Sequence, residues 1–149
     1  MSLTFRTATR DDVPAIVALL TDDILGATRE TDDLAPYLAA FDQLQNEGGN
    51  QVIIGVQNDE IVATYQLIFI SGLSLRAARR AQVESIRVVA RLRGQGLGQA
   101  MMDNADKRAR AAGCSLMQFT TNKTRNRAQA FYERLGFTPS HVGYKRSLD

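Results

Sequence analysis

A glycine-rich turn between a β-branched segment and a helical one constrains this chain more than any other feature. Three glycines fall within five residues, at Gly94, Gly96 and Gly98, and they let the backbone adopt positive φ angles and approach a ligand closely. The preceding residues 84–89 favour a strand, and a helix is expected to begin at about Leu97. The first backbone N–H groups of a helix are unpaired and lie at the positive end of its dipole. The pattern therefore predicts an anion-binding strand–turn–helix.

The spacing of the glycines excludes two common phosphate-binding motifs. The dinucleotide fingerprint needs two residues before its last glycine, and a Walker loop needs a lysine and a hydroxyl residue after its last glycine. Neither requirement is met here, although Arg91 and Arg93 flank the turn and add positive charge. A sharp turn that only requires glycine is the alternative interpretation of this stretch taken alone.

Length and composition predict one globular domain spanning residues 1–149. The chain is 44% hydrophobic and 23% charged, as is usual for a domain that buries most of its unfolded surface without cross-links. The N-terminus lacks the apolar core of a signal peptide, and no apolar run approaches the roughly 18 residues of a membrane helix. A single cysteine, Cys114, excludes an internal disulfide, and a single histidine, His141, excludes a multi-histidine metal site. We therefore expect a cytoplasmic protein without a metal cofactor or a membrane partner.

The charge is divided unevenly along the chain. Residues 1–75 contain three arginines against eleven acidic residues, a balance of −8, whereas residues 76–149 contain fifteen basic residues against five acidic ones, a balance of +10. A basic half suits a polyanion, and an acidic half suits a cationic or amine-bearing partner. Solvated surface charge is the alternative for most single residues. Nucleic acid is not expected as a partner, because the few aromatic residues are not interleaved with the basic ones.

Hydrophobic periodicity predicts strands and helices along the whole chain. An apolar stripe beginning at Val13 indicates the first helix, with Thr9 or Asp11 as its cap, and the acidic segment 22–33 follows it. Strand–helix–strand crossovers in the latter half imply an α+β or α/β three-layer fold with a mixed sheet. In chain order we expect a strand over 3–8, the first helix, a helix over 34–46, strands over 51–56, 60–70 and 82–89, a helix over 97–112, a strand over 115–121, a helix capped by Asn126 and ended by Gly136, and a strand over 142–148.

Two motifs in the second half resemble the signatures of one family. Residues 93–98, Arg-Gly-Gln-Gly-Leu-Gly, resemble the Arg/Gln-x-x-Gly-x-Gly/Ala acetyl-CoA signature of the GNAT superfamily of N-acetyltransferases, small-molecule acetyltransferases among them. Residues 128–137 resemble the second signature, Ala-x-x-Phe-Tyr-x-x-x-Gly-Phe. Gly98 and Tyr132 are 34 residues apart, with a helix and a strand between them, as in that family. The resemblance implies a GNAT-type fold, in which helices flank a mixed, mostly antiparallel central sheet.

The resemblance also implies transfer of the acetyl group of acetyl-CoA, as a co-substrate, to an amine. Backbone N–H groups of the glycine turn would hold the pyrophosphate, and the strands ending near Val89 and Thr121 would splay to admit the pantetheine arm. The Val88 N–H would face the thioester oxygen as an oxyanion donor. Asn126 would contact the pantetheine, unless it only caps its helix. The cofactor-binding residues expected on this basis are Val88, Val89, Arg93, Gly94, Gln95, Gly96, Leu97, Gly98, Gln99 and Asn126.

Tyr132 matches the family position that gives a proton or a hydrogen bond to the departing CoA thiolate. By spacing alone it lies on the apolar stripe of its helix, with Phe131 and Leu135, and such a residue is more often part of the core. A buried tyrosine hydroxyl nevertheless needs a partner. The resemblance therefore implies that Tyr132 is the general acid.

Attack by an amine also requires a base or a water relay near the acetyl group, because the nucleophile must be neutral. Glu84 is the best candidate, since strand alternation places it on one face with Ile86 and Val88. Residues 83–88 also resemble the Ile-Glu-Asp-Ile-x-Val strand of glucosamine-phosphate N-acetyltransferases, from which Ser85 departs. A carboxylate that pairs with a nearby arginine is the alternative interpretation of Glu84.

The expected acceptor is the primary amine of a small molecule, attacked directly in a ternary complex. A lysine or N-terminal amine of a protein or peptide is one alternative, and a non-catalytic acyl-CoA-binding regulatory module is another. The acidic segment 22–33 suits a polyamine, an aminoglycoside or a lysine side chain, whereas residues 139–145 resemble endings of acetyltransferases that act on aminoalkylphosphonates. Family resemblance alone implies a homodimer.

Overall fold

Two compact units make up the structure. The computed structural model describes residues 2–22 and 26–149, and these residues fall into the units Met1–Gln118 and Phe119–Asp149. Each unit is described by itself below. Residues 23–25 of the acidic segment lie outside the described residues. The expectation of one domain over the whole chain stays a prediction.

The first unit contains all the strands of the central sheet. In chain order its elements are β1 (Thr4–Thr7), a 3₁₀ turn (Arg10–Asp12), α1 (Val13–Thr21), α2 (Gly26–Arg29), α3 (Ala35–Gln45), β2 (Asn50–Gln57), β3 (Glu60–Ile70), α4 (Ser74–Ala77), β4 (Arg80–Val88), a second 3₁₀ turn (Ala90–Leu92), α5 (Leu97–Ala111) and β5 (Leu116–Gln118). Apart from the short α2 and α4 and the two 3₁₀ turns, these elements lie where hydrophobic periodicity predicted them, within a few residues at their ends.

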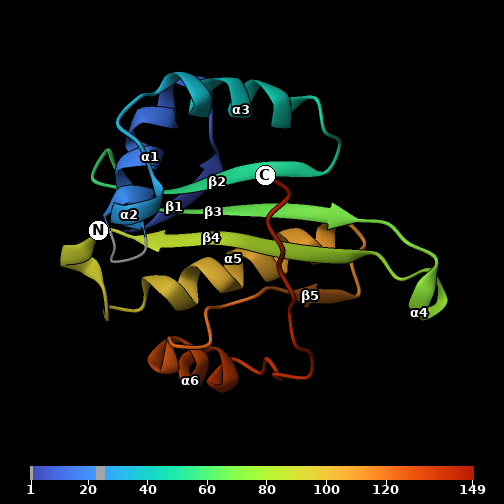
Figure 1. The fold of residues 1–149 in the computed structure, drawn as a ribbon. Helices are drawn as coiled ribbons and strands as arrows, with labels where there is room; N and C mark the ends of the chain where they lie inside the picture. The colour runs from blue at the N-terminus through green and yellow to red at the C-terminus, as the bar shows by residue number, and fades with distance from the viewer. Residues whose placement is uncertain (1, 23–25) are drawn as a thin grey trace. The chain divides into compact units, whose positions relative to one another are not determined.

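The five strands lie side by side in the order β1-β2-β3-β4-β5 (Figure 1). The pairs from β1 to β4 are antiparallel, whereas β5 runs parallel to β4 after the crossover through α5. A tight turn with positive φ at Asn58 and Asp59 joins β2 to β3, as the asparagine–aspartate pair favours. The predicted fold class, a mixed and mostly antiparallel sheet flanked by helices, is confirmed.

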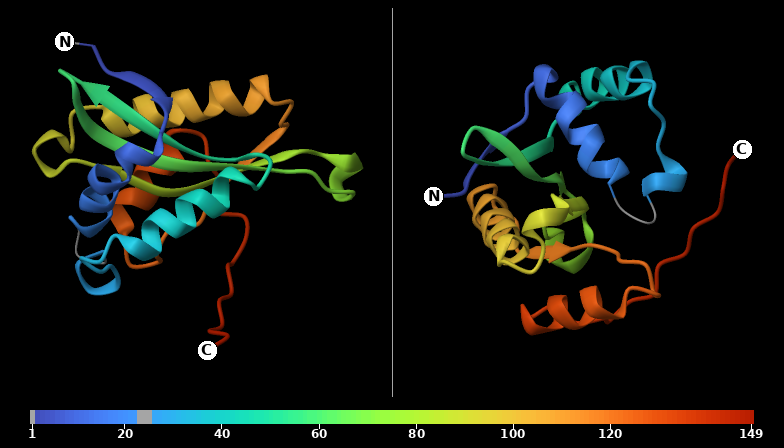
Figure 2. Two further views of the ribbon diagram at one scale, coloured as in Figure 1. Left: turned by 90° about the horizontal axis from the view of Figure 1, so that it is seen from above. Right: turned by 90° about the vertical axis from the view of Figure 1, so that its left-hand side faces the viewer.

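Different helices cover the two faces of this sheet. On one face, Ile54 of β2 is fully buried in a core to which α1 contributes Val17 and α3 contributes Phe41. On the other face, Tyr65 of β3 reaches Asn104 of α5. Figure 2 shows α5 on the opposite side of the sheet from α1 and α3. The sheet is therefore the middle of three layers in this unit.

A polar network fastens α5 to the sheet. The Tyr65 hydroxyl donates to Asn104 Oδ1 over 2.6 Å, and Arg108 Nε donates to the same oxygen over 2.9 Å. Burial raises the pKa of Tyr65, so its hydroxyl stays protonated and keeps donating. Because buried hydroxyls and amides must be satisfied, this contact fixes how α5 sits on the sheet, and with it the position of the glycine turn at the N-terminus of α5.

The start of α1 depends on one buried carboxylate. Asp12 Oδ2 accepts from the Thr9 backbone N–H over 2.7 Å, and the Asp12 oxygens accept from the Arg6 guanidinium over 2.7 and 3.0 Å. The guanidinium of Arg6, followed by the Thr9 N–H, holds the pKa of Asp12 below its usual value. Thr9 is therefore the cap of this first turn, one of the two caps expected, and Asp12 rather than Asp11 completes its capping box and ties the turn to β1.

Replacing Asp12 with alanine is expected to lower the free energy of unfolding by about 2 kcal/mol, the upper range for loss of a helix cap. The pKa of Asp12 is lower in the folded protein than in the unfolded chain. Its contribution to the free energy of unfolding is therefore fully present above the usual carboxyl pKa of about 4, and it is lost as the pH falls through the lower pKa of the folded protein. Urea unfolding of both proteins across acidic pH measures the difference. Asp11→Ala, an exposed neighbour, is the control. An equal loss in the control would contradict this assignment.

The β3–β4 hairpin ends in a left-handed turn. Leu75, Arg76 and Ala77 within and at the end of α4 all have positive φ, so α4 is not a regular right-handed helix. Figure 2 shows this hairpin extending beyond the other elements of the first unit. At its base, Arg79 donates to Ser71 Oγ over 3.1 Å. Arg76 therefore lies at the tip of a long hairpin.

The second unit consists of one helix and an aromatic cluster. Helix α6 spans Asn126–Arg134, and Gly136 follows it with a φ of 93°, as predicted. Arg125 occupies the cap position, so the expectation that Asn126 is the cap was wrong. The reason is that Asn122 closes the preceding turn instead, where its Oδ1 accepts from the Thr124 N–H over 3.0 Å.

The predicted final strand over 142–148 is absent from the described structure. Residues 137–149 have no regular secondary structure, and Val142, Tyr144 and Leu148 are 77%, 92% and 87% exposed. An alternating sequence forms a strand only when a neighbouring strand pairs with it, and no strand is described within residues 119–149. Among the described helices of the chain, none is long and apolar enough to cross a membrane.

Candidate active site

The glycine turn is open at the N-terminus of α5. Gly94 and Gly96 have φ angles of 76° and 87°, and a Cβ atom added at either would meet nothing within 4 Å. Gly96 is the cap of α5, so the N–H groups of residues 97–99 begin the helix without intrahelical partners. The turn therefore combines open space with unpaired helix N–H groups, the two features from which the sequence predicted an anion site.

The arginines that flank the turn are already engaged within the protein. Arg91 forms an ion pair with Glu60. Arg93 Nε donates to the Val88 carbonyl over 3.2 Å, and its Nη2 donates to the Asp22 carbonyl over 2.6 Å. The donors that remain unpaired at this turn are therefore chiefly the first backbone N–H groups of α5. The Arg93 side chain instead joins the end of β4 to the end of α1.

The outer edge of β4 is open beside this turn. β5 pairs with β4 only from Arg80 to Gln82, so beyond Gln82 this edge has no strand partner among the residues that the structure describes. The Val89 N–H donates inward to the Val62 carbonyl over 2.8 Å. Because successive N–H groups of a strand point to opposite edges, the Val88 N–H points outward. Val88 is thus available as the expected oxyanion donor, whereas the Val89 N–H is not available to a ligand.

A β-bulge at Ser85 changes which face of the sheet Glu84 lies on. Glu84 pairs with Gln66 and Arg87 pairs with Thr64, so two residues of β4 lie opposite Tyr65, and Ser85 has a φ of 53°. Glu84 and Arg87 therefore share a face, and the expectation that Glu84 shares a face with Ile86 and Val88 was wrong. The reason is the extra residue, which interrupts the alternation of the strand.

Glu84 lies half-buried on the face of the sheet that α1 and α3 cover. Gln66, the cross-strand neighbour of Glu84, lies on the same face of β3 as Thr64. Thr64 in turn pairs with Ile54 of β2, which is buried in the core beneath α1 and α3. The carboxylate Oε1 accepts from Gln82 Nε2 over 3.0 Å. Its described partner is therefore an amide rather than the arginine of the alternative interpretation.

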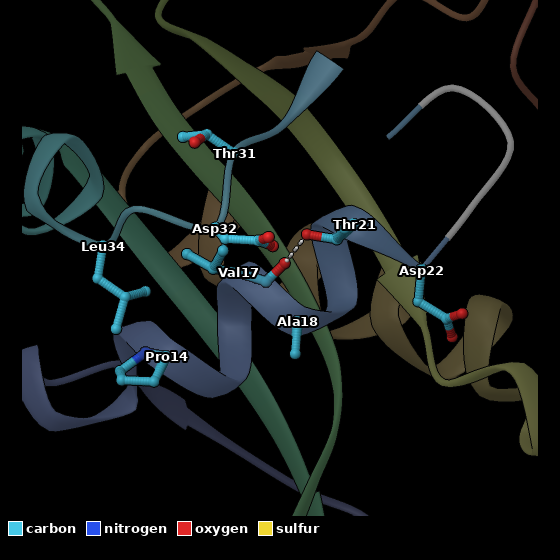
Figure 3. A pocket seen from close by; sticks show the side chains of 8 residues that line it. All are labelled: Pro14, Val17, Ala18, Thr21, Asp22, Thr31, Asp32 and Leu34. Atoms are coloured by element: carbon cyan, nitrogen blue, oxygen red, sulfur yellow. Dashed lines mark hydrogen bonds between the residues drawn. The ribbon is translucent and has the colours of Figure 1, made fainter. Parts of the chain in front are cut away.

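A hollow of about 540 Å³ lies between α1 and residues 31–34. Figure 3 shows the Thr21 and Asp32 side chains pointing toward each other across it, and Thr21 Oγ1 donates to the Val17 carbonyl over 2.8 Å. The hollow is within the size range of small-molecule pockets. It combines two carboxylates and two hydroxyls with an apolar floor, and its lining residues are Pro14, Val17, Ala18, Thr21, Asp22, Thr31, Asp32 and Leu34.

In the second unit, Tyr132 lies in the aromatic cluster. Its ring centroid is 4.3 Å from that of Phe119, 5.3 Å from that of Phe131 and 6.3 Å from that of Phe137. This packing agrees with the apolar stripe predicted from the spacing, and it holds the half-buried ring in one orientation. Asn126 is the exposed first residue of the same helix.

Comparison with known proteins identifies the family. The model of the Acetyltransferase (GNAT) family matches residues 14–137, which include the glycine turn, β4, the hollow and Tyr132. This chain belongs to the GNAT family. The resemblance of the two sequence motifs is thereby confirmed, and members of this family transfer acetyl groups.

The individual proteins that this GNAT protein resembles are named for different functions. It is 33% identical over 67 residues to an aminoalkylphosphonate N-acetyltransferase of Salmonella typhimurium, a match that covers 45% of this chain and only 44% of that relative. A transcriptional regulator from Bacillus halodurans has 37% identity and a TM-score of 0.94, with 99% of this chain and 100% of that one covered. Glucosamine-6-phosphate N-acetyltransferase from Arabidopsis thaliana has a TM-score of 0.81 at 16% identity, with both chains fully covered, and shows the shared fold.

Sequence reasoning missed two parts of the candidate site. The hollow combines residues about ten positions apart, and the acidic composition of 22–33 was its only signal in the sequence. The side chain of Gln118 meets that of Gln82 only because β5 pairs with β4, and the strand register was not predictable from either segment. Among the described residues, no cluster of three or more His, Cys, Asp or Glu side chains is placed to hold a metal ion.

Proposed function

We propose that this protein transfers the acetyl group of acetyl-CoA directly to the primary amine of a small molecule. The observation on which the proposal chiefly rests is the open turn at the N-terminus of α5, next to the unpaired edge of β4. The backbone N–H groups of residues 97–99 bind the diphosphate, and Gly94 and Gly96 leave room for it. Membership of an acetyltransferase family supports the same ligand.

In this proposal each residue has one chemical role. Acetyl-CoA supplies the acetyl group as a thioester. The Val88 N–H donates a hydrogen bond to the carbonyl oxygen, and Glu84 accepts a proton from the amine as the nitrogen–carbon bond forms. Tyr132 donates a proton to the sulfur as the carbon–sulfur bond breaks. Proximity of the two substrates supplies more of the rate enhancement than either proton transfer does, roughly 7–11 kcal/mol of the barrier in well-oriented cases.

The hollow supports a cationic acceptor. Asp32 gives its rim negative charge, whereas the Asp22 carboxylate is paired with the Arg93 guanidinium at 3.9 Å. Arg93 also joins the Asp22 carbonyl to the Val88 carbonyl at the end of β4. Helix α1, which lines the hollow, also covers the face of the sheet on which Glu84 lies. A small molecule with one amine in the hollow and another at Glu84 suits this arrangement, as a diamine or a polyamine would.

An amine-panel assay that follows release of the CoA thiol tests this function. We expect amine-dependent thiol release, with a product heavier by one acetyl group in mass spectrometry. Diamines should be better acceptors than monoamines of the same length, which lack the second cationic group. Acetylation of peptide lysines alone would favour a protein acetyltransferase. Acetyl-CoA binding without turnover of any amine would favour the regulatory module, the interpretation that suits the name of the Bacillus halodurans protein.

Replacing Asp32 with asparagine is expected to raise the KM for a diamine about threefold while kcat changes little, because an exposed ion pair contributes about 0.2–1 kcal/mol. Asp33→Asn is the matched control, since it removes the same charge from the adjacent position, where Asp33 Oδ1 accepts from the Ala35 N–H over 3.0 Å. Steady-state kinetics at low salt compare the two variants. Equal KM values in both would show that the hollow does not bind the acceptor.

A further inference from the structure

A row of hydrogen-bonded side chains extends from Glu84 across β4 to β5. Gln82 Nε2 donates to Glu84 Oε1 over 3.0 Å, and Gln118 Nε2 donates to Gln82 Oε1 over 2.8 Å. At the far end, Arg80 Nη1 lies 3.5 Å from Gln118 Oε1. All four side chains are half-buried. The strand register places them on one face, because Arg80 and Gln82 pair with Leu116 and Gln118 of β5.

The row fixes the direction of the Gln82 amide. Its oxygen accepts from Gln118, so its NH₂ group faces Glu84. A flipped amide would place its oxygen against the carboxylate and its NH₂ against the NH₂ of Gln118, and both hydrogen bonds would be lost. A carboxylate at a bulge would otherwise be free to rotate. Gln82 therefore holds one oxygen of Glu84 and leaves the other oxygen for a substrate.

We propose that Gln82 is a positioning residue, which orients the Glu84 carboxylate toward the proton of the attacking amine, and that Gln118 supports it. The inference rests on the proposed function, because it assumes that Glu84 accepts this proton. Gln82 itself neither gains nor loses a proton in the step. Misplacement of a catalytic group by about 1 Å can lower a rate by up to about 100-fold, so removing one of the bonds that hold Glu84 should lower kcat measurably.

Gln66 offers a matched control for Gln82. It is also a half-buried glutamine on the same face, and it is the cross-strand neighbour of Glu84 on β3. Its Nε2 donates to Asn50 Oδ1 over 2.8 Å, however, and not to the carboxylate. Methionine has nearly the shape of glutamine without its amide, so each substitution keeps the size of the side chain, while Gln82→Met removes two side-chain hydrogen bonds and Gln66→Met removes one.

The experiment measures kcat for amine acetylation in single and double variants. We expect Gln82→Met to lower kcat about tenfold with an unchanged KM for acetyl-CoA, Gln118→Met to lower it by a smaller factor, and Gln66→Met to change it by less than about twofold. In a Glu84→Gln background, Gln82→Met should have almost no further effect, because the carboxylate on which it acts is gone. Thermal unfolding of each variant verifies that all are folded.

The outcomes separate this inference from the proposed function. If the wild-type protein acetylates amines but Gln82→Met lowers kcat equally with and without Glu84, Gln82 has only a structural role and the inference is wrong. The same holds if Gln82→Met and Gln66→Met have equal effects, or if Glu84→Gln keeps wild-type kcat. If the wild-type protein acetylates no amine, the proposed function fails as well, and that result is recognised before any variant is made.

Discussion

Replacing Gly96 with valine is expected to lower the affinity for acetyl-CoA at least 100-fold. Gly96 has a φ of 87°, which valine tolerates poorly, and relief of that strain would rotate the first N–H groups of α5 away from the diphosphate. The new side chain would also occupy the open space above the turn. Hydrogen bonds to charged groups contribute about 1.5–3 kcal/mol each, and the loss of two such bonds weakens binding by at least about 100-fold. Isothermal titration calorimetry with acetyl-CoA measures the change.

Gly113 provides the control for this substitution. It lies just beyond the other end of α5, has a φ of 80°, and a Cβ atom there would also meet nothing within 4 Å. Gly113→Val should therefore destabilise the protein by a similar amount through backbone strain, yet leave acetyl-CoA binding within about twofold of the wild type. Tight binding by Gly96→Val would refute the assignment of the diphosphate to this turn, and so would equal losses of affinity in both variants.

Replacing Tyr132 with phenylalanine is expected to lower kcat for amine acetylation by about 10²–10⁴-fold, the usual contribution of a general acid. The affinity for acetyl-CoA should stay nearly unchanged, because the diphosphate is bound elsewhere in the chain. Phenylalanine retains the ring that packs against Phe119 and Phe131, so folding should not be the cause of the loss. Single-turnover kinetics measure the chemical step directly.

Tyr144→Phe is the control for the loss of a hydroxyl, since Tyr144 is 92% exposed and has no proposed role. It should leave kcat unchanged. A normal single-turnover rate in Tyr132→Phe would mean that Tyr132 only packs in the aromatic cluster, as its helical spacing alone suggested. A loss confined to acetyl-CoA affinity, with a normal rate at saturation, would assign Tyr132 to cofactor binding rather than to proton transfer.

The parts of the fold that depend on local patterns were predictable from the sequence. The glycine turn was evident because glycines at Gly94 and Gly96 are needed for positive φ, and the helix over 97–112 was evident from its apolar stripe. The tight turn at Asn58 and Asp59 followed from residues that favour it. In each case, nearby residues contain all the information that determines the structure.

Features that depend on distant partners were not predictable. Arg93 looked like a phosphate-binding residue, yet its guanidinium donates to the Asp22 carbonyl, 71 positions away. The sequence over 142–148 alternates as a strand does, but no described strand of its unit pairs with it. The bulge at Ser85 could not be inferred either, because serine has no strong preference for positive φ. In all three cases a partner that is distant in the sequence, rather than residue type, decides the structure.

The bulge also determines how the proposed acceptor specificity of this protein could be redesigned. The two segments of β4 on either side of Ser85 are out of phase, so even-numbered positions up to Glu84 and odd-numbered positions from Arg87 onward face α1. A mutant library built on simple alternation along the strand would therefore randomise the wrong positions in one segment. A library directed at the face beneath α1 should therefore include Arg87, keep Glu84 and Gln82 for the proposed proton transfer, and leave Ile86 and Val88 unchanged.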